Sequence, residues 1–295
     1  MNAFIGVSVI IPTRNSSPYL KKCLLSIASQ EYPKSKFEIV VVDNDSRDDT
    51  QGIAKKFGAK VIGVSGIPPL VCEQRNIGAD RAIHEYLYFF DHDMELPKGF
   101  LKEFAKVVSK TRGHVDAWQV PEKVVCGNAL IGAMKTFEKM TYQGTPIAAA
   151  RIIKKIVYKK TPDRYDPLLS GGPADWDFQL QLQEMGATIG TFPLYVLHHE
   201  EFLTIIASID KKTGYFRGLT RYRKKWEERN PAMVPILTQK QLGVWYRYVG
   251  VFFEHNKWRH TVLNFPLYFT LLGYKILMGA RYIFHSEGWV KRNST

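Results

Sequence analysis

The chain has 295 residues, of which 45% are hydrophobic and 13% aromatic, and it carries a formal net charge of +13. Its apolar content is ample for a packed core, and its length allows one large α/β domain or one domain with an appendage. The three cysteines, Cys23, Cys72 and Cys126, are widely spaced and form no Cys-x-x-Cys pair. This spacing argues against a disulfide framework or a zinc site and favours a reducing, cytosolic setting.

The positive charge is concentrated near the C-terminus. From Glu201 to Thr295 there are 16 Lys plus Arg and 6 Asp plus Glu, a balance of +10, which leaves about +3 for the first 200 residues. A strongly basic tail is typical of proteins that bind nucleic acid or an anionic membrane surface. The first residues contain no basic segment and reach Pro12 too soon for a signal peptide, so we predict a strand there.

The N-terminal half predicts alternating strands and helices. Strands are expected at 7–12, 37–42, 59–64 and 86–90, where the residues are apolar and often β-branched or aromatic. One helix is expected to begin with Ser17 as N-cap and Pro18 at its first position. A second helix is expected to end at a C-cap at Gly58, and a third is expected over 72–84. A loop with two prolines is expected at 65–70. This alternation predicts a parallel, doubly wound sheet.

Residues 86–95 read Tyr-Leu-Tyr-Phe-Phe-Asp-His-Asp-Met-Glu, so an apolar strand leads directly into two carboxylates. Residues i and i+2 of a strand share a face, so Asp91 and Asp93 could hold one cation, and the cation a diphosphate. The alternative is a strand followed by a polar turn. Polar residues also end the first two strands, and parallel strands would bring all these ends into one cleft. No G-x-G-x-x-G or Walker lysine motif is present, which disfavours dinucleotide and P-loop sites.

Four blocks in this half resemble family 2 glycosyltransferases. They are Val-Ser-Val-Ile-Ile-Pro-Thr-Arg-Asn at 7–15, Ile-Val-Val-Val-Asp-Asn-Asp-Ser-Arg-Asp-Asp-Thr at 39–50, Arg-Asn-Ile-Gly-Ala-Asp-Arg-Ala at 75–82 and Phe-Phe-Asp-His-Asp at 89–93. The resemblance covers roughly residues 5–200. It implies the GT-A fold, a Rossmann-like, mostly parallel α/β sheet flanked by helices. It also implies a nucleotide-sugar donor, a divalent metal (Mn²⁺ or Mg²⁺) and inversion at the anomeric carbon.

The resemblance implies roles for single residues of these blocks. The implied contacts of the nucleotide sugar are Pro12, Thr13, Arg14, Asn15, Asp43, Asp45, Arg75, Asp91 and His92. Among them Asp43 would bind the base or ribose and Asp91 the ribose or the metal, whereas His92 has no specific role. Asp93 would ligate the metal directly. The family often has a Glu where Ser16 stands, so no acidic nucleoside contact is carried over to that position.

Simpler roles are open for several of these residues. Asp43 and Asp45 could cap the following helix through an Asx turn. Arg75 could pair with an acid on the surface of its own helix.

The middle of the chain predicts a helix over 96–109 and one or two strands within 115–125, whereas 127–165 has no clear period. The stretch 170–182 contains Asp175, which we predict as a helix N-cap, and Asp177, which we expect at the exposed start of that helix. In the resembled family an acidic pair before a Trp stands here, and its aspartate is the general base. Ala174 replaces the usual glutamate. The resemblance therefore implies Asp175 as base and Trp176 as a floor for the acceptor, with a simple cap as the alternative for Asp175.

This chemistry needs both a base and a metal. An acceptor hydroxyl is a poor nucleophile until its proton is removed, and a divalent metal stabilises the leaving diphosphate. A strand is predicted over 188–197, followed by His198 and His199. In the family a histidine after this strand often completes the metal site, and imidazole beside carboxylates suits Mn²⁺ better than Mg²⁺. His198 is the first choice for this metal ligand and His199 the second. The alternative is that the two are a pair of surface histidines without a metal.

We divide the chain into a catalytic domain at 1–205 and a basic, aromatic helical extension at 206–295. Residues 261–274 carry no charge but are shorter than the roughly 20 residues of a spanning helix. We therefore expect amphipathic helices in a membrane interface, or else helices that pack on the catalytic domain or pair two chains into a homo-oligomer. No RNA- or DNA-binding motif is present, so no nucleic-acid partner is expected.

Together these features predict an inverting, metal-dependent glycosyltransferase held peripherally at the cytosolic face of a membrane. It would transfer sugar from a UDP- or GDP-sugar to a lipid-linked acceptor, of polyprenyl or dolichyl type, or to another membrane-proximal acceptor. The alternative is a catalytically inactive scaffold that binds a nucleotide or a partner.

Overall fold

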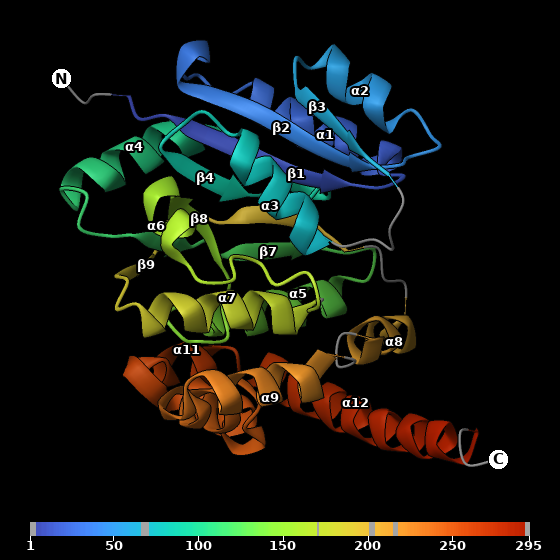
Figure 1. Cartoon of the computed structure of the whole chain (residues 1–295). Helices are drawn as coiled ribbons and strands as arrows, with labels where there is room; N and C mark the ends of the chain where they lie inside the picture. The colour runs from blue at the N-terminus through green and yellow to red at the C-terminus, as the bar shows by residue number, and fades with distance from the viewer. Residues whose placement is uncertain (1–3, 66–70, 170, 201–203, 215–217, 293–295) are drawn as a thin grey trace.

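The computed structural model describes residues 4–65, 71–169, 171–200, 204–214 and 218–292, so most of the loop predicted at 65–70 lies outside it. Its main sheet has seven strands in the order β3-β2-β1-β4-β8-β6-β9 (Figure 1). The bounds are β1 Val7–Thr13, β2 Phe37–Asn44, β3 Lys60–Val64, β4 Tyr86–Phe89, β6 Ala117–Gln119, β8 Ala150–Lys154 and β9 Ile189–Thr191. The strands pair in parallel, except that β8 runs antiparallel to both of its neighbours. The predicted α/β class with a mostly parallel sheet is confirmed.

The alternation of side chains along β1 supplies both faces of the sheet. Val7, Val9 and Ile11 enter one core, with α1 (Ser17–Ala28) and α4 (Phe100–Lys110). Ile10 enters the other core, with α3 (Val71–Arg81) and α7 (Gly172–Glu184). Successive residues of a strand point to opposite faces, so a fully apolar strand needs helices on both sides.

Helix α3 packs against the sheet through a glycine, Gly78. A Cβ built on Gly78 would come within 2.4 Å of Ile10 Cγ2 and 3.2 Å of Val42 Cγ2. Only a residue without a side chain allows this approach, and the approach sets the position of Arg75 one turn earlier.

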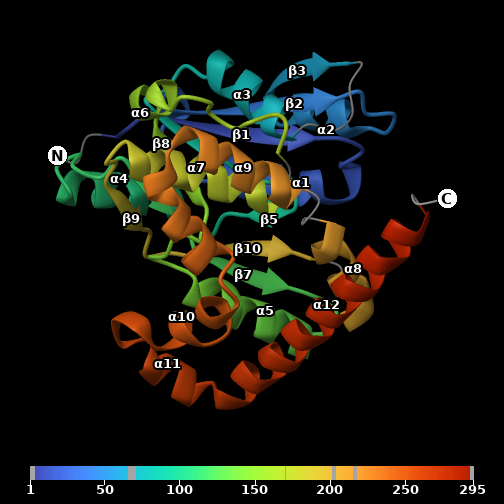
Figure 2. The ribbon, with the colours of Figure 1, turned by 60° about the horizontal axis from the view of Figure 1, so that its bottom comes forward.

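A smaller sheet joins three short strands, β5 (Met94–Glu95), β10 (Val196–His199) and β7 (Glu122–Val125) (Figure 2). Here His198 lies opposite Met94 in the β10–β5 register. The two histidines thus belong to a strand and do not follow one. The strand predicted over 188–197 is wrong as a single element: β9 and β10 are separated by a bend at Pro193, which has no N–H for a ladder.

The remaining helices before residue 205 are α2 (Thr50–Lys56), α5 (Ala129–Thr141) and α6 (Lys155–Lys160). Two predicted helix starts also differ from the structure. Ser16, not Ser17, is the N-cap of α1, with Pro18 in the first turn. The helix predicted from residue 96 begins at Phe100, after Gly99 at φ 76°.

The C-terminal helices pack on α5 and α7, on the lower side of the molecule in Figure 1. They are α8 (Ile205–Gly214), α9 (Leu219–Arg229), α10 (Val251–Phe253), α11 (Trp258–Leu263) and α12 (Phe265–Arg292), with 3-10 and π turns between them. Tyr222 and Trp226 of α9 are fully buried in the α7 core, and Phe252 and Leu271 pack with Phe137 of α5. Within the described ranges, no helix is both long and apolar enough to cross a bilayer.

Candidate active site

The ends of β1, β2 and β4 lie together at the carboxyl edge of the main sheet. Thr13 at the end of β1 is the register partner of Asp43 on β2. The N–H of Phe90, just after β4, donates to the carbonyl of Ile10 on β1 at 3.0 Å. The parallel pairing therefore brings Thr13, Asp43 and Asp91 to one edge, as the strand prediction requires.

Asp43 is fully buried and organises the loop that follows β2. Its carboxylate accepts hydrogen bonds from Thr13 Oγ1 at 3.0 Å and Gln51 Nε2 at 2.8 Å, and from both N and Oγ of Ser46. The alternative in which Asp43 or Asp45 caps the following helix is wrong, because the N-cap of α2 is Asp49. Asp45 has a positive φ of 52° in this loop.

Arg14 and Asn15 lie exposed at the same edge, after the buried Pro12. Asn15 has a positive φ of 50°, and its Oδ1 accepts from the N–H of Arg47 at 2.8 Å. The loops after β1 and β2 are thus joined by hydrogen bonds, which gives the edge a fixed shape.

Asp91 and Asp93 do not lie on one face of a strand. Strand β4 ends at Phe89, and a turn follows, in which the N–H of Met94 donates to the carbonyl of Asp91. The expectation that both carboxylates share one face of a strand is therefore wrong, because they lie in a turn after it, whereas their binding of a metal stays a prediction. His92 lies between the two aspartates with its ring 6.5 Å from that of Tyr19 on α1.

Arg75 connects two carboxylates that are far apart in the sequence. Its Nη2 lies 3.0 Å from Asp91 Oδ1, and its Nη1 lies 3.0 Å from Asp175 Oδ1. The guanidinium also lies 4.8 Å from the ring centre of Tyr165. Arg75 therefore does not pair on its own helix surface; it joins the end of β4 to the first turn of α7.

Arg151 and Glu122 belong to the same cluster, and neither was predicted from the sequence. Arg151 Nη2, from β8, lies 3.3 Å from Asp91 Oδ2 and 3.4 Å from Glu122 Oε1. Burial raises the pKa of Asp91, but the guanidinium groups of Arg151 and Arg75 outweigh it and hold that pKa well below its usual range. Asp91 is therefore a permanent anion held by two cations.

His198 lies beside Asp93 and Glu122. Its Nε2 is 3.5 Å from Asp93 Oδ2, and its Nδ1 is 2.8 Å from both Glu122 Oε2 and Lys139 Nζ. Burial and the Lys139 ammonium lower the pKa of His198, but hydrogen bonds with Asp93 and Glu122 outweigh them and raise it to about 9. The same contact with His198 lowers the pKa of Asp93 against the opposing effect of burial.

His199 points elsewhere, because neighbouring residues of β10 face opposite sides. Its Nε2 lies 2.5 Å from Glu95 Oε1, and its backbone N–H donates to the carbonyl of Asp93 at 2.8 Å. Its side chain lines a cavity of about 360 Å³ beside α1, together with Asp93 and Lys22. Of the two histidines, His198 is the one in contact with the Asp93 carboxylate.

Two residues of metal-binding type, Asp93 and His198, lie side by side in this cluster. Within the residues that the structure describes, no group of three or more His, Cys, Asp or Glu is arranged to hold an ion. Asp93 and His198 form a two-residue pair, one carboxylate with one imidazole, and this set suits Mn²⁺. Metals in phosphate-transfer sites commonly take one or two protein ligands and complete their shell with phosphate oxygens and water.

Asp175 lies in the first turn of α7, and its prediction as N-cap is wrong. The helix starts two residues before Ala174, and its N-cap is Gly171 at φ 60°. Asp175 Oδ1 is held by Arg75, while Oδ2 has no hydrogen bond within the described part of the chain. One carboxylate oxygen is thus fixed and the other is available to a hydroxyl group.

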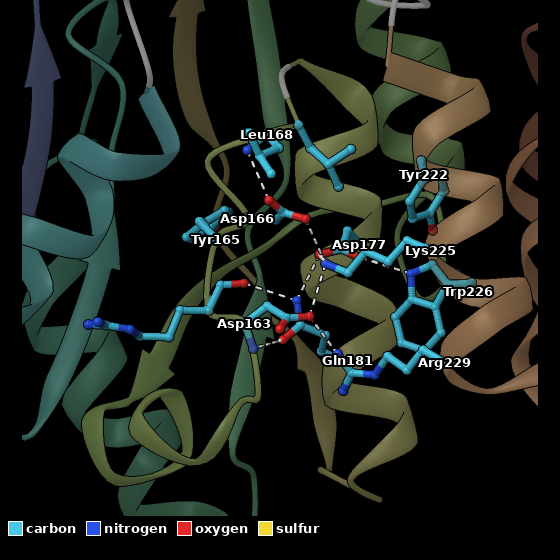
Figure 3. Close-up of polar contacts among 12 residues, drawn as sticks. Asp163, Tyr165, Asp166, Leu168, Asp177, Gln181, Tyr222, Lys225, Trp226 and Arg229 are labelled. Atoms are coloured by element: carbon cyan, nitrogen blue, oxygen red, sulfur yellow. Dashed lines mark hydrogen bonds and ion pairs between the residues drawn. The ribbon is translucent and has the colours of Figure 1, made fainter. Parts of the chain in front are cut away.

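Trp176 is largely buried, and its Nε1 donates to the carbonyl of Ile147 at 3.2 Å. Its ring lines a pocket of about 240 Å³ between α5, α7 and the C-terminal helices. Asp177 is fully buried, so its expected position on an exposed helix start is wrong. It accepts hydrogen bonds from Lys225 and Trp226 of α9, as Figure 3 shows.

Comparison with known proteins identifies the family of this arrangement. The family model for glycosyl transferase family 2 matches residues 8–165, a range that ends before Asp175 and His198. The glycosyltransferase AglE of Haloferax volcanii is 35% identical over 112 residues, which cover 36% of this chain and 36% of AglE. TarS of Staphylococcus aureus, a poly(ribitol-phosphate) β-N-acetylglucosaminyltransferase, is 30% identical over 167 residues, which cover 53% of this chain and 26% of TarS. The matches thus span about a third and a quarter of these two relatives.

Solved structures show the same fold. TarS 1-349 in complex with UDP-GlcNAc has a TM-score of 0.55 at 23% identity and covers 74% of this chain and 66% of that one. A mannosyltransferase from Pyrobaculum calidifontis in complex with GDP-Man and Mn²⁺ has a TM-score of 0.60 at 18% identity and covers 96% of this chain and 88% of that one. The predicted GT-A fold is confirmed by these likenesses.

Proposed function

The chain belongs to glycosyl transferase family 2, and from this membership we propose that it is an inverting glycosyltransferase with a nucleotide-sugar donor. The observation that carries the proposal is the bridge of Arg75 between Asp91 and Asp175. It holds a carboxylate of the sheet edge and a carboxylate of α7 within reach of one guanidinium. A donor and an acceptor bound on the two sides of this bridge would have their reacting atoms close together.

The donor is a UDP- or GDP-sugar bound along the carboxyl edge of β1, β2 and β4. The loops with Pro12, Thr13, Arg14 and Asn15, and those with Asp43 and Asp45, would surround the nucleoside. Arg75 and Arg151 would then lie near the diphosphate, where their charges favour an anion. TarS and the mannosyltransferase, which share the fold, were solved with a UDP- and a GDP-sugar, which supports either nucleotide.

A divalent metal, Mn²⁺ or Mg²⁺, would be held by Asp93 and His198 together with oxygens of the diphosphate. It would act as a Lewis acid on the leaving group. Asp91 is already bound by Arg75 and Arg151, so its first role is to orient these two arginines. Asp91 as a second ligand and His199 as a substitute for His198 are the less favoured assignments.

Asp175 is the proposed general base. Arg75 fixes its Oδ1, which leaves Oδ2 to accept the proton of the acceptor hydroxyl as that hydroxyl attacks the anomeric carbon. A single displacement of this kind inverts the anomeric centre and needs no protein nucleophile. Trp176, whose ring lines the pocket beside α7, is the proposed acceptor contact.

The acceptor is lipid-linked or lies close to a membrane, and the segment 206–295 is the proposed membrane-associating part. The net charge of +10 in the C-terminal third and the exposed apolar side chains of α11 and α12 support this assignment. The cytosolic face is the proposed location, and a homo-oligomer through the same helices is the competing use of that surface.

The test compares the wild type with Asp175→Asn and Asp93→Ala for nucleotide-sugar binding and for donor turnover in Mn²⁺. Asp175→Asn should bind donor within about twofold of the wild type and lose about 10²- to 10⁴-fold in kcat, the usual contribution of a general base. Asp93→Ala should weaken donor binding only when Mn²⁺ is present. Wild-type binding without turnover on a broad acceptor panel would instead favour an inactive nucleotide-binding scaffold.

A further inference from the structure

The pocket beside Trp176 lies between the catalytic part of the chain and the C-terminal helices. Its volume is about 240 Å³, and its walls come from α5, the start of α7, the π turn at 246–250 and α12. Four basic side chains line it against two acidic ones. They are Lys135, Lys139, Arg247 and Lys275, with Glu138 and Glu200. A pocket with this excess of cations attracts an anion.

The lysines of the pocket have carboxylate partners. Lys135 Nζ lies 2.5 Å from Glu200 Oε2, and Lys275 Nζ lies 3.3 Å from Glu138 Oε1. Lys139 Nζ lies 2.5 Å from Glu122 Oε2. These pairs neutralise most of the local charge, so a ligand must be recognised chiefly by the remaining cation.

That cation is Arg247. Its guanidinium is held by aromatic contacts, 5.0 Å from the ring centre of Trp176 and 5.6 Å from that of Tyr142, and its Nη1 donates to the carbonyl of Gln241 at 2.8 Å. Across the described ranges, no carboxylate lies within ion-pair distance of it. Stacking fixes the planar group but leaves its charge and its other N–H donors for an anion, and a guanidinium matches a phosphate well.

Apolar surface surrounds this charge. Trp176, Tyr142, Ile147 and Met278 form walls of the pocket. On α12, Ile276 and Leu277 are exposed next to the buried Lys275. Lys139 connects the pocket to the catalytic cluster, because its Nζ also lies 2.8 Å from His198 Nδ1. An acceptor anchored here would therefore lie beside the proposed metal and base.

We propose that this pocket is a phosphate-binding subsite for an amphipathic acceptor. Arg247 binds the phosphate, and the aromatic and aliphatic walls take the first part of the attached apolar chain. The acceptor role rests on the proposed function, whereas the binding of an amphipathic phosphate does not. An alkyl or prenyl phosphate fits the combination of one unneutralised guanidinium with apolar walls.

The test measures binding of farnesyl phosphate, farnesol and inorganic phosphate to the full chain by calorimetry. Wild-type protein should bind farnesyl phosphate at least about tenfold more tightly than either of the other two, because only it uses both parts of the pocket. Arg247→Gln should weaken farnesyl phosphate about 10- to 100-fold, the range for a lost charge-assisted contact. Met278→Glu, which adds a repelling carboxylate to the wall, should weaken it similarly.

Arg223→Gln is the matched control, because Arg223 is exposed on α9 and pairs with Glu227. Unfolding temperatures of all variants identify any that fail to fold, and the two pocket variants alter different walls. Unchanged farnesyl phosphate binding in either folded variant overturns the proposal, and so does inorganic phosphate that binds as tightly as farnesyl phosphate. UDP- and GDP-sugar binding is measured in the same samples: its absence in the wild type contradicts the proposed function, not the pocket.

Discussion

Arg75 is the residue on which the geometry of the cleft depends. It is buried, and its two terminal nitrogens reach Asp91 and Asp175, 16 and 100 residues away in the sequence. The rigid fork of a guanidinium can hold two carboxylates in a fixed relation, whereas an ammonium group acts as a point charge. The position of the proposed base therefore depends on a side chain of α3, which lies on the proposed donor side of the cleft.

Replacement of Arg75 by Lys should keep the charge and lose the bridge. We expect kcat for donor turnover to fall by about 10- to 1000-fold, because misplacement of a catalytic group by about 1 Å already costs about 100-fold. The apparent KM for the donor should change much less. Steady-state kinetics with UDP- and GDP-sugars measures both, and Arg81→Lys on the exposed end of α3 is the control. A kcat equal to that of the wild type would show that the bridge has no role in turnover.

Asp48 connects the starts of two helices near the nucleotide edge. Its Oδ2 accepts from the N–H of Ser17 on α1 at 3.0 Å, and its Oδ1 accepts from the N–H of Thr50 on α2 at 3.1 Å. Burial raises the pKa of Asp48, but hydrogen bonds from the side chains and backbone N–H groups of Thr50 and Ser17 together outweigh it and lower the pKa to about 2. The lowered pKa means that the ionised form contributes to the free energy of unfolding.

The sign of the pH effect follows from this shift. Because the folded pKa is lowered, the contribution of Asp48 is fully present above about pH 4 and is lost as the pH falls toward 2. Asp48→Ala should thus cost about 1 kcal/mol at pH 7, as for other capping side chains. Its difference from the wild type should shrink between pH 4 and pH 2, as measured by urea unfolding. Asp49→Ala, at a position without a side-chain capping bond, is the control, and an equal cost at pH 3 and pH 7 would contradict the prediction.

At the scale of elements, α7 carries two aspartates that face different parts of the molecule. Asp175 and Asp177 are two residues apart, which places them about 200° apart around the helix. Asp175 faces Arg75, and Asp177 faces α9, where Lys225 Nζ lies 2.9 Å from its Oδ2 and Trp226 Nε1 lies 2.8 Å from its Oδ1 (Figure 3). The helix that carries the proposed base is therefore fixed by contacts of α9 with the face that carries Asp177.

Lys225→Met should destabilise this junction. Lys225 is shared by Asp177, Asp166 and Asp163 at 2.9–3.0 Å, and its loss leaves Asp177 as a fully buried carboxylate without a cation. The free energy of unfolding should fall by about 3–5 kcal/mol, the range for a broken buried ion pair. Urea unfolding measures it. Lys224→Met, at an exposed position one residue earlier, should cost less than about 0.5 kcal/mol, and equal costs for the two variants would refute the role of the junction.

These elements also show what the sequence could predict. Local patterns located the first four strands and the helices between them, because an apolar run or a helical period is a property of neighbouring residues. The cleft at the carboxyl edge followed from parallel pairing. Asp177 was misplaced because its burial depends on α9, about 48 residues away. Arg151 was missed because β8 lies in a stretch without a clear period, and its partners Asp91 and Glu122 come close to it only in the folded molecule.

At the scale of the whole molecule, the C-terminal helices have an inner and an outer side. Inward, Trp226, Phe252 and Leu271 complete cores with α7 and α5. Outward, large apolar side chains are exposed at the corner between α11 and α12, among them Leu263 at 83% exposure and Phe269 at 52%. Because removal of the tail would open two cores, point changes at this corner are a better test of its outer surface than a truncation.

The corner should insert into an anionic membrane surface. Exposed Trp258, Leu263 and Phe269 would enter the interface, while Arg259 and other cations of the basic tail approach anionic headgroups. The full chain should therefore sediment with vesicles that contain 30% phosphatidylglycerol more than with pure phosphatidylcholine vesicles, and less at high salt. Leu263→Asp and Phe269→Asp should each weaken this binding by about tenfold, since each removes apolar contact and adds a repelled charge.

Ile83→Asp supplies the matched control, because Ile83 is 72% exposed but lies after α3, far along the chain from the tail. It should sediment like the wild type. If Leu263→Asp and Phe269→Asp also sediment like the wild type, the corner does not bind the membrane. Size-exclusion chromatography of the same variants tests the competing use of the corner, which is contact between two copies of the chain. A wild-type dimer that becomes a monomer in both variants would assign the corner to that contact. The prediction therefore requires that these substitutions lower vesicle binding without a change in oligomeric state.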